Sequence, residues 1–224
     1  MKWSGLLVGY ITRFGLEVMC SIDKSDLHKV PSKGPLILYS NHTGSVEVPI
    51  IFTELLPRPI TGIAKIETWD GWFLHWVFNL WNIIPIRRGE ADMVAMRESL
   101  NALEQGYILG IAPEGTRNKT GAMIKAQPGI VTLALHGDAT LLPMANWGGE
   151  NFLENLKRLK RTDFFMRVGK PFKINTRSQR VNGELRQQIT DEMMYKVAAL
   201  LPEKYRGVYS DLGNATENYL ECVK

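Results

Sequence analysis

Short apolar runs alternate with segments of helical periodicity along this chain, and this alternation constrains its fold more than any other feature. The runs are bounded by turn-forming residues, as is typical of buried strands. The segments between them repeat apolar residues every three or four positions, as amphipathic helices do. We therefore predict an α/β fold, a mostly parallel or mixed sheet flanked by helices, preceded by an N-terminal amphipathic or interfacial helical segment. The predicted strands are 35–40, 60–66, 83–86, 107–111, 140–145 and 164–168, and the predicted helices are 46–56, 71–80, 91–104, 128–136 and 184–200.

One domain accounts for most of the chain. It has 224 residues, 45% of them hydrophobic, with no internal repeat and no linker-like segment, which suits a single core. We predict a membrane-associating helical segment at 1–28, a main domain at 29–206 and a C-terminal tail at 207–224. The two cysteines, Cys20 and Cys222, stand at opposite ends without a CxxC pattern, so a zinc ribbon or a disulfide scaffold is not expected.

Positive charge is concentrated late in the chain. Residues 151–206 hold 13 Lys and Arg against 6 Asp and Glu, including Lys157, Arg158, Lys160 and Arg161. Such a cluster could face an anionic membrane, an acidic partner or phosphate-bearing ligands, or be a solvated helix face. Nucleic-acid binding is not expected, because the net charge is only +4 and the aromatic residues lie away from the basic third.

Two segments carry membrane signals although no apolar run approaches the ~18–20 residues of a spanning helix. The first forms one apolar stripe at helical spacing: Trp3, Leu6, Leu7, Tyr10, Ile11, Phe14 and Val18. It fits either an in-plane interfacial helix or a helix packed on the domain, and no signal peptide is expected. The second, 69–86, contains four of the six Trp. Because Trp favours the water–lipid boundary, we favour a membrane-facing or acyl-chain-facing helix over an aromatic core helix.

A histidine and a carboxylate follow the first strand of the main domain. His42 comes two residues after that strand, and Glu47 stands five residues later at the start of the predicted helix. The two can meet if His42 lies in the turn and Glu47 in the first helical turn. A carboxylate bonded to one imidazole nitrogen fixes the tautomer and leaves the other nitrogen as a general base. The alternative is a structural histidine.

A second polar segment, 112–117, follows the strand at 107–111. Arg117 offers a planar fork for phosphate, and Thr116 with nearby backbone N–H groups could complete an oxyanion or phosphate cradle. Glu114 could accept a hydrogen bond from a ligand hydroxyl. Lys125 lies near the start of the next helix, where anions are favoured. A polar surface loop is the alternative.

Two further blocks complete the set of candidates. Arg87 and Arg88 follow the strand at 83–86, and in an extended chain they point to opposite sides, so one of them would enter a site. Pro143 interrupts the apolar strand at 140–145. It would line an acyl groove or mark an edge strand.

In order and separation, these blocks resemble those of the glycerophospholipid acyltransferase family, and its lysophosphatidic-acid acyltransferase branch in particular. That family carries NH-x4-D, then I-P-I-x-R-x-G, then F-P-E-G-T-R-S, then a short apolar block with V-P. The corresponding residues here are Asn41-His42 with Glu47, 84–89, 113–117 and Leu142-Pro143-Met144. The resemblance covers roughly residues 35–171, and four ordered blocks are far more specific than any one of them.

The resemblance implies an activity and its reactants. The main domain would be an acyltransferase domain that moves a fatty acyl group from acyl-CoA or acyl-carrier protein to a hydroxyl of lysophosphatidic acid, giving phosphatidic acid. No metal or bound cofactor is expected, and the partners would be a lysophospholipid, the acyl donor and a membrane lipid surface. The chain would be peripheral or monotopic on the cytoplasmic face.

The resemblance also assigns roles to residues. His42 would be the general base and Glu47 its acidic partner. The acceptor's glycerol phosphate would be bound by Glu114, Gly115, Thr116 and Arg117, with Arg87 or Arg88 assisting. Pro143 would lie near the acyl path.

Two positions depart from the family pattern. Glu47 replaces an Asp, which keeps the charge but adds a methylene, and Gly44 stands where the family usually has Ser. These changes leave two alternatives open: acyl transfer to another acceptor, such as glycerol-3-phosphate or another lysolipid, and a non-catalytic lipid-binding member.

Overall fold

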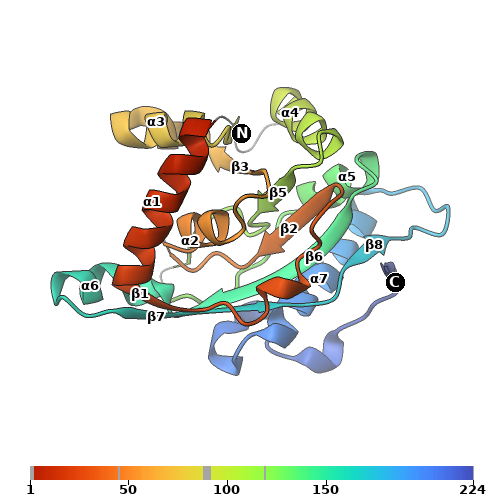
Figure 1. Cartoon of the computed structure of the whole chain (residues 1–224). Helices are drawn as coiled ribbons and strands as arrows, with labels where there is room; N and C mark the ends of the chain where they lie inside the picture. The colour runs from red at the N-terminus through yellow and green to blue at the C-terminus, as the bar shows by residue number, and fades with distance from the viewer. Residues whose placement is uncertain (1–2, 45, 88–91, 119, 224) are drawn as a thin grey trace.

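The computed structural model describes residues 3–44, 46–87, 92–118 and 120–223, and it is built on one mixed sheet (Figure 1). The main strand order is β1-β7-β6-β2-β5-β3-β4, with β8 paired to β6 and β9 paired to β8. The five strands from β6 to β4 run parallel, whereas β7 is antiparallel to β6. The strands are β1 (Cys20–Asp23), β2 (Leu36–Ser40), β3 (Ile60–Lys65), β4 (Ile84–Ile86), β5 (Ile108–Ile111), β6 (Thr140–Trp147), β7 (Thr162–Val168), β8 (Phe172–Ile174) and β9 (Leu220–Cys222). The predicted α/β class with a mixed sheet is confirmed.

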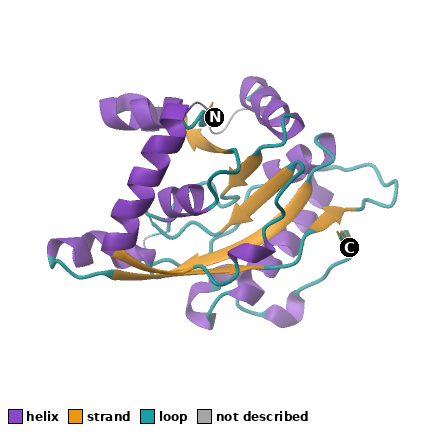
Figure 2. Cartoon of the chain, viewed as in Figure 1, coloured by secondary structure: helices purple, strands orange, loops and turns teal. Residues whose placement is uncertain are grey.

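Helices cover both faces of this sheet (Figure 2). The helices are α1 (Trp3–Met19), α2 (Glu47–Glu54), α3 (Trp72–Leu80), α4 (Met93–Glu104), α5 (Gly129–His136), α6 (Phe152–Lys157) and α7 (Gly183–Leu200). Residues of α1, α2 and α3 belong to the core on one face, and residues of α4, α5 and α7 to the core on the other. The central strand β2 serves both cores by alternation, since Ile37 and Tyr39 face the second while Leu36 and Leu38 face the first.

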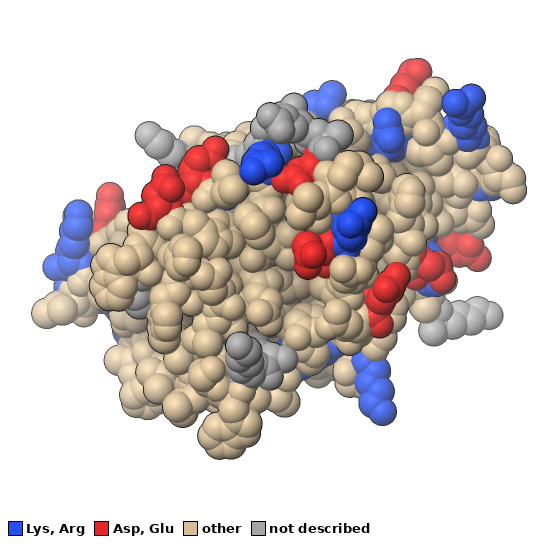
Figure 3. Space-filling model, turned by 90° about the horizontal axis from the view of Figure 1, so that it is seen from above, with Lys and Arg blue, Asp and Glu red and all other residues tan. Residues whose placement is uncertain are grey.

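Helix α1 presents its apolar stripe outward. Its buried residues are Gly5, Gly9 and Leu16, and a Cβ at Gly9 would lie 2.5 Å from Leu56 Cδ1, so the helix packs closely on the domain through its small residues. The outward side chains include Trp3, which is 84% exposed, and Phe14, which is 70% exposed, together with Leu7, Tyr10, Ile11 and Val18. Figure 3 shows a broad surface without Lys, Arg, Asp or Glu on this side of the molecule, at its lower left. Helix α1 is thus packed on the domain, and it also exposes the kind of apolar face that an interfacial helix requires.

The tryptophan-rich segment divides between the core and the surface. Trp81 is buried and stacks on Phe52 with ring centroids 5.8 Å apart. Trp69 packs edge-on against Phe78 at 4.9 Å. In α3 itself, Trp72 is 84% exposed and Trp76 is also exposed. The segment therefore has both the buried aromatic rings expected of a core helix and the exposed tryptophans expected of a membrane-facing helix. None of the helices in the described part of the chain is both long enough and apolar enough to span a membrane.

Both predicted end segments contribute strands to the sheet. Within 1–28, the helix ends at Met19 and β1 pairs with β7. Within 207–224, β9 pairs with β8, and the Tyr209 hydroxyl donates to Asp191 of α7 at 2.9 Å. Residues 20–28 and the tail are therefore continuous with the main domain rather than separate from it.

Candidate active site

Three of the candidate residues, His42, Glu47 and Glu114, meet at the carboxyl end of β2. Because β2, β5 and β6 are adjacent and parallel, the loops that follow them emerge at the same edge of the sheet. His42 lies in the loop after β2, and Glu114 lies in the loop after β5. Asn146 stands near the end of β6. The fold thus brings together segments separated by up to about a hundred residues of sequence.

His42 and Glu47 are in direct contact. Nδ1 of His42 lies 2.5 Å from Oε1 of Glu47, which also accepts the Gly44 N–H at 3.0 Å. Burial would raise the pKa of Glu47, but the hydrogen bond and charge of His42 outweigh it, so this pKa lies below its ordinary value. The ionised carboxylate is an acceptor, so Nδ1 carries a proton, and in the neutral imidazole Nε2 is left with a free lone pair. The His42 side chain is 20% exposed, which leaves it accessible to a reactant.

Glu114 holds the main chain of His42. Its Oε1 accepts the His42 N–H and its Oε2 accepts the Ile124 N–H, both at 2.9 Å. The His42 carbonyl in turn faces the Asn118 N–H at 3.5 Å. Burial raises the pKa of Glu114 to about 7, against the two N–H groups, which favour the carboxylate. Both Glu114 oxygens are used within the protein, so this carboxylate supports the site, whereas the sequence predicted that it would contact ligand.

Asn41 and Asn146 form a reciprocal pair that sequence reasoning missed. Asn41 Nδ2 donates to the Asn146 carbonyl at 2.8 Å, and the Asn146 N–H donates to Asn41 Oδ1 at 2.9 Å. Asn146 Nδ2 donates to the Asn41 carbonyl at 3.0 Å, and the Thr43 hydroxyl donates to Asn146 Oδ1 at 2.9 Å. The residues on both sides of His42 are therefore fixed to β6. Asn41 is part of the NH block, but nothing in the local sequence marks Asn146.

The loop that holds Glu114 continues through Gly115, Thr116 and Arg117 to Asn118, whose N–H faces the His42 carbonyl. Gly115 has φ +68°, a left-handed conformation that turns the chain after Glu114. Thr116, Arg117 and Lys125 are exposed. In the described parts of the chain, neither cation forms an ion pair. These two charges are available to an anionic ligand.

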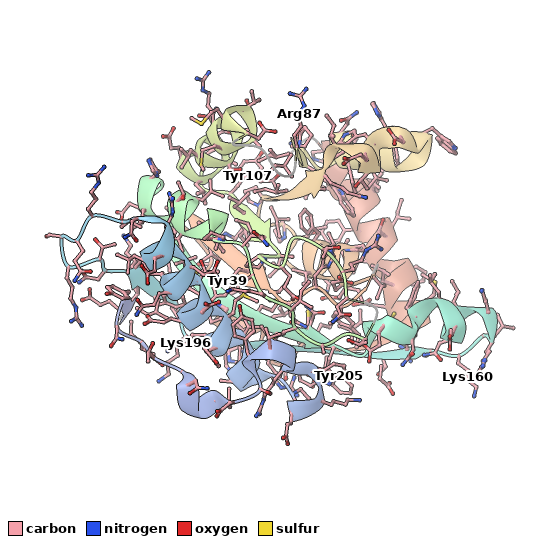
Figure 4. All side chains as sticks on the ribbon, turned by 180° about the vertical axis from the view of Figure 1, so that it is seen from behind. Tyr39, Arg87, Tyr107, Lys160, Lys196 and Tyr205 are labelled. Atoms are coloured by element: carbon pink, nitrogen blue, oxygen red, sulfur yellow. The ribbon has the colours of Figure 1, made fainter. Side chains whose placement is uncertain are left out.

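Arg87 lies away from His42, and Pro143 lies inside the sheet, where its predicted place near the acyl path stays a prediction. Arg87 follows β4, three strand spacings from β2, or roughly 14 Å. Its side chain is exposed and directed away from the sheet (Figure 4). Arg88 lies outside the described residues. Pro143 is buried inside β6 opposite Tyr39, where its carbonyl accepts the Gly169 N–H at 2.9 Å, so it is not at a sheet edge.

The described residues contain no group of three or more His, Cys, Asp and Glu side chains placed to hold a metal ion. The expectation that no cofactor is bound stays a prediction.

Comparisons with known proteins agree on one family. The family model described as Acyltransferase matches residues 21–147, more than half of the chain. The chain is 30% identical over 135 residues to the 1-acyl-sn-glycerol-3-phosphate acyltransferase of Bacillus subtilis, covering 58% of this chain and 65% of that protein. It is 28% identical over 134 residues to the mouse 1-acyl-sn-glycerol-3-phosphate acyltransferase alpha, covering 58% and 47%. The matches thus span about half to two thirds of these relatives.

A solved structure has the same fold. The 1-acyl-sn-glycerophosphate acyltransferase PlsC from Thermotoga maritima superposes with a TM-score of 0.60 at 19% identity, covering 88% of this chain and 78% of that chain.

Proposed function

The chain belongs to the Acyltransferase family, and from this premise we propose that it transfers a fatty acyl group from acyl-CoA or acyl-carrier protein to the free hydroxyl of 1-acyl-sn-glycerol-3-phosphate. The observation that carries the proposal is the 2.5 Å contact between His42 Nδ1 and Glu47 Oε1 at the carboxyl end of β2. This contact lies inside the segment that the family model matches. The names of the relatives supply the substrate class.

In the proposed reaction, Nε2 of His42 removes the proton from the acceptor hydroxyl as its oxygen attacks the thioester carbonyl carbon. A carbon–oxygen bond forms, the carbon–sulfur bond breaks, and the proton passes from His42 to the departing thiolate. Glu47 stabilises the imidazolium that exists between these two transfers. The donor is a substrate, so the chemistry requires no bound cofactor.

The acceptor's phosphate would be held by the exposed cations near His42. Arg117 and Lys125 are unpaired within the described residues, and Arg117 can bind two phosphate oxygens at once. Thr116 and the backbone of Gly115 would complete this subsite. Arg87 would reach the phosphate only if the ligand extends toward β4, and the assisting role of Arg88 stays a prediction.

The exposed face of α1 supports membrane association. A peripheral enzyme can place such a helix in the lipid interface, with Trp and Phe side chains among the headgroups. Trp72 and Trp76 of α3 would enter the same interface. We place the chain on the cytoplasmic face, as a peripheral or monotopic protein.

The test is acyl transfer by the detergent-solubilised protein. Oleoyl-CoA and an acyl-carrier donor would be offered with lysophosphatidic acid, glycerol-3-phosphate or another lysolipid. We expect phosphatidic acid from lysophosphatidic acid, and a loss of about a hundred-fold or more in kcat for His42→Ala. The matched control is His136→Ala, because that histidine is exposed and, among the described residues, its side chain is hydrogen-bonded to the Thr132 carbonyl of its own helix.

Each other outcome assigns a different function. Transfer to another acceptor with indifference to lysophosphatidic acid would replace the substrate and keep the chemistry. Full activity in His42→Ala would refute this base. No product with any donor and acceptor would favour a non-catalytic lipid-binding protein.

A further inference from the structure

A basic lobe with exposed leucines projects from the sheet at the end of the molecule where α6 lies. We define the α6 lobe as residues 152–161, comprising α6 and the turn before β7. Three leucines of the lobe are exposed: Leu153, Leu156 and Leu159. Leu159 is 94% exposed and has φ +52°, a conformation that disfavours a branched side chain. Nothing within the described protein accounts for an apolar residue at this tip.

The cations of the lobe are equally exposed. Lys157, Arg158 and Lys160 have no ion-pair partner in the residues that the structure describes. The lobe contains one acidic residue, Glu154. Figure 4 shows Lys160 at the outer end of the lobe. The surface of the lobe is therefore both apolar and strongly positive.

Arg161 fixes the lobe against α1. Its guanidinium donates to the Glu17 carbonyl at 2.7 Å and to the Cys20 carbonyl at 2.6 Å, at the end of that helix. The lobe thereby lies beside the half of α1 that exposes Phe14 and Val18. The lobe is therefore held next to the end of α1, at the same end of the molecule as part of the apolar face of that helix (Figure 1).

We propose that the α6 lobe is a second membrane contact that selects anionic lipid. Exposed leucines gain by entering the boundary between headgroups and acyl chains, and each nearby cation strengthens binding to an anionic surface. A CoA phosphate or an acidic carrier would use the cations alone, whereas the exposed leucines and the attachment of the lobe to the end of α1 favour lipid. The inference extends the proposed membrane association but does not depend on acyl transfer.

The experiment is sedimentation of the full chain with vesicles of phosphatidylcholine, with and without phosphatidylglycerol. Arg158→Gln/Lys160→Gln should weaken binding to the anionic vesicles about 25-fold at low salt and leave binding to neutral vesicles unchanged. Leu159→Asn should weaken binding to both vesicles about ten-fold, and Asn suits a positive φ better than Leu, so folding is preserved.

The matched control is Arg177→Gln/Arg180→Gln. It removes the same charge from exposed positions in the loop after β8, at the opposite end of the molecule (Figure 1), and should leave binding to both vesicles nearly unchanged. Equal binding of the lobe variant and the unaltered protein to anionic vesicles would overturn the proposal. So would an effect of the lobe variant only on the KM for acyl-CoA in detergent, which would assign the cations to the donor. Sedimentation needs no catalysis, so failure of the acyl-transfer proposal would be seen separately.

Discussion

At the residue scale, the two departures from the family pattern are neighbours. Glu47 Oε2 is buried without a hydrogen-bond partner in the described residues. A Cβ at Gly44 would lie 3.6 Å from this oxygen and 3.4 Å from the Gly149 carbonyl, so a side chain fits there. Because Gly44 has no side chain, it leaves space for a hydrogen-bond donor to the Glu47 carboxylate.

Gly44→Ser should use that space. The new hydroxyl can donate to Glu47 Oε2, and we expect the free energy of unfolding to rise by about 1 kcal/mol with kcat nearly unchanged. Denaturant unfolding measures the change. Gly44→Ala is the control, since it fills the space without a donor and should give no gain. Equal stabilities of the two variants would show that the hydroxyl does not reach the carboxylate.

The protonation of Glu114 should affect both stability and turnover. Burial raises its pKa from 4.5 to about 7, so the folded state binds this proton more tightly than the unfolded chain. The resulting stabilisation is complete below about pH 4.5 and is lost as the pH rises to about 7. Turnover, in contrast, should increase as the pH rises to about 7. In protonated Glu114 one oxygen becomes a hydroxyl, which is a weaker acceptor than a carboxylate oxygen, so the hydrogen bond from the N–H of either His42 or Ile124 is weakened.

Glu114→Gln tests this reasoning, because its amide resembles the protonated acid. We expect kcat of the variant to stay low above pH 7. Its pH profile should therefore lack the step near pH 7 that we expect in the wild-type profile. His42 and Glu47 are the titratable groups that face Glu114, and both remain in the variant. If Glu114→Gln kept the wild-type pH profile, the step near pH 7 would not belong to Glu114.

At the scale of elements, the sequence predicts well those whose pattern is local. The strand β2 and the helix α4 begin and end within two residues of their predicted bounds, because apolar runs, periodicity and turn residues all agree there. The short elements β1, α6, β8 and β9 were not predicted. The three strands among them have three or four residues each, and each is defined by the strand it pairs with, which no local pattern reveals.

The site shows the same division. Spacing and resemblance were enough to pair His42 with Glu47, which are five residues apart. The bonds from Asn146 to Asn41 connect residues 105 positions apart and follow from the adjacency of β6 and β2. The support that Glu114 gives to His42, across 72 positions, is likewise a property of the assembled sheet.

The two faces of α1 should respond differently to truncation. Phe14→Ala removes an exposed ring, so the free energy of unfolding should stay within about 0.5 kcal/mol, while binding to lipid vesicles weakens. Leu16→Ala empties a buried position and should cost about 2–4 kcal/mol. Unfolding and vesicle sedimentation of both variants check this. A large loss of stability in Phe14→Ala would mean that the ring packs against the protein.

At the scale of the whole molecule, the C-terminal segment supports the site from a distance. The Met123 N–H donates to the Tyr205 carbonyl at 2.9 Å, and the Val208 N–H donates to the Met123 carbonyl at 3.2 Å. The next residue, Ile124, holds Glu114, which in turn holds His42. The tail thus reaches the proposed base through a continuous series of main-chain and carboxylate contacts.

Gly207 is the position at which this support can be tested. Its φ is +52°, and a Cβ there would lie 1.9 Å from the Met123 carbonyl oxygen, so Gly207→Ala must displace one of the two segments. We expect a loss of about 3 kcal/mol in the free energy of unfolding. Gly183→Ala is the control, because a Cβ there meets nothing within 4 Å, and its stability should be unchanged or up to about 1 kcal/mol higher.

Hydrogen exchange separates transmission to the site from simple destabilisation. If the displaced tail releases Ile124, then the amides of Ile124 and His42 should exchange faster in Gly207→Ala under conditions where the protein remains folded. The amides of β3, which lies beyond β5 from the site, should keep their protection. Faster exchange throughout the sheet would indicate loss of global stability alone, and unchanged exchange at His42 would mean that the tail and the base are independent.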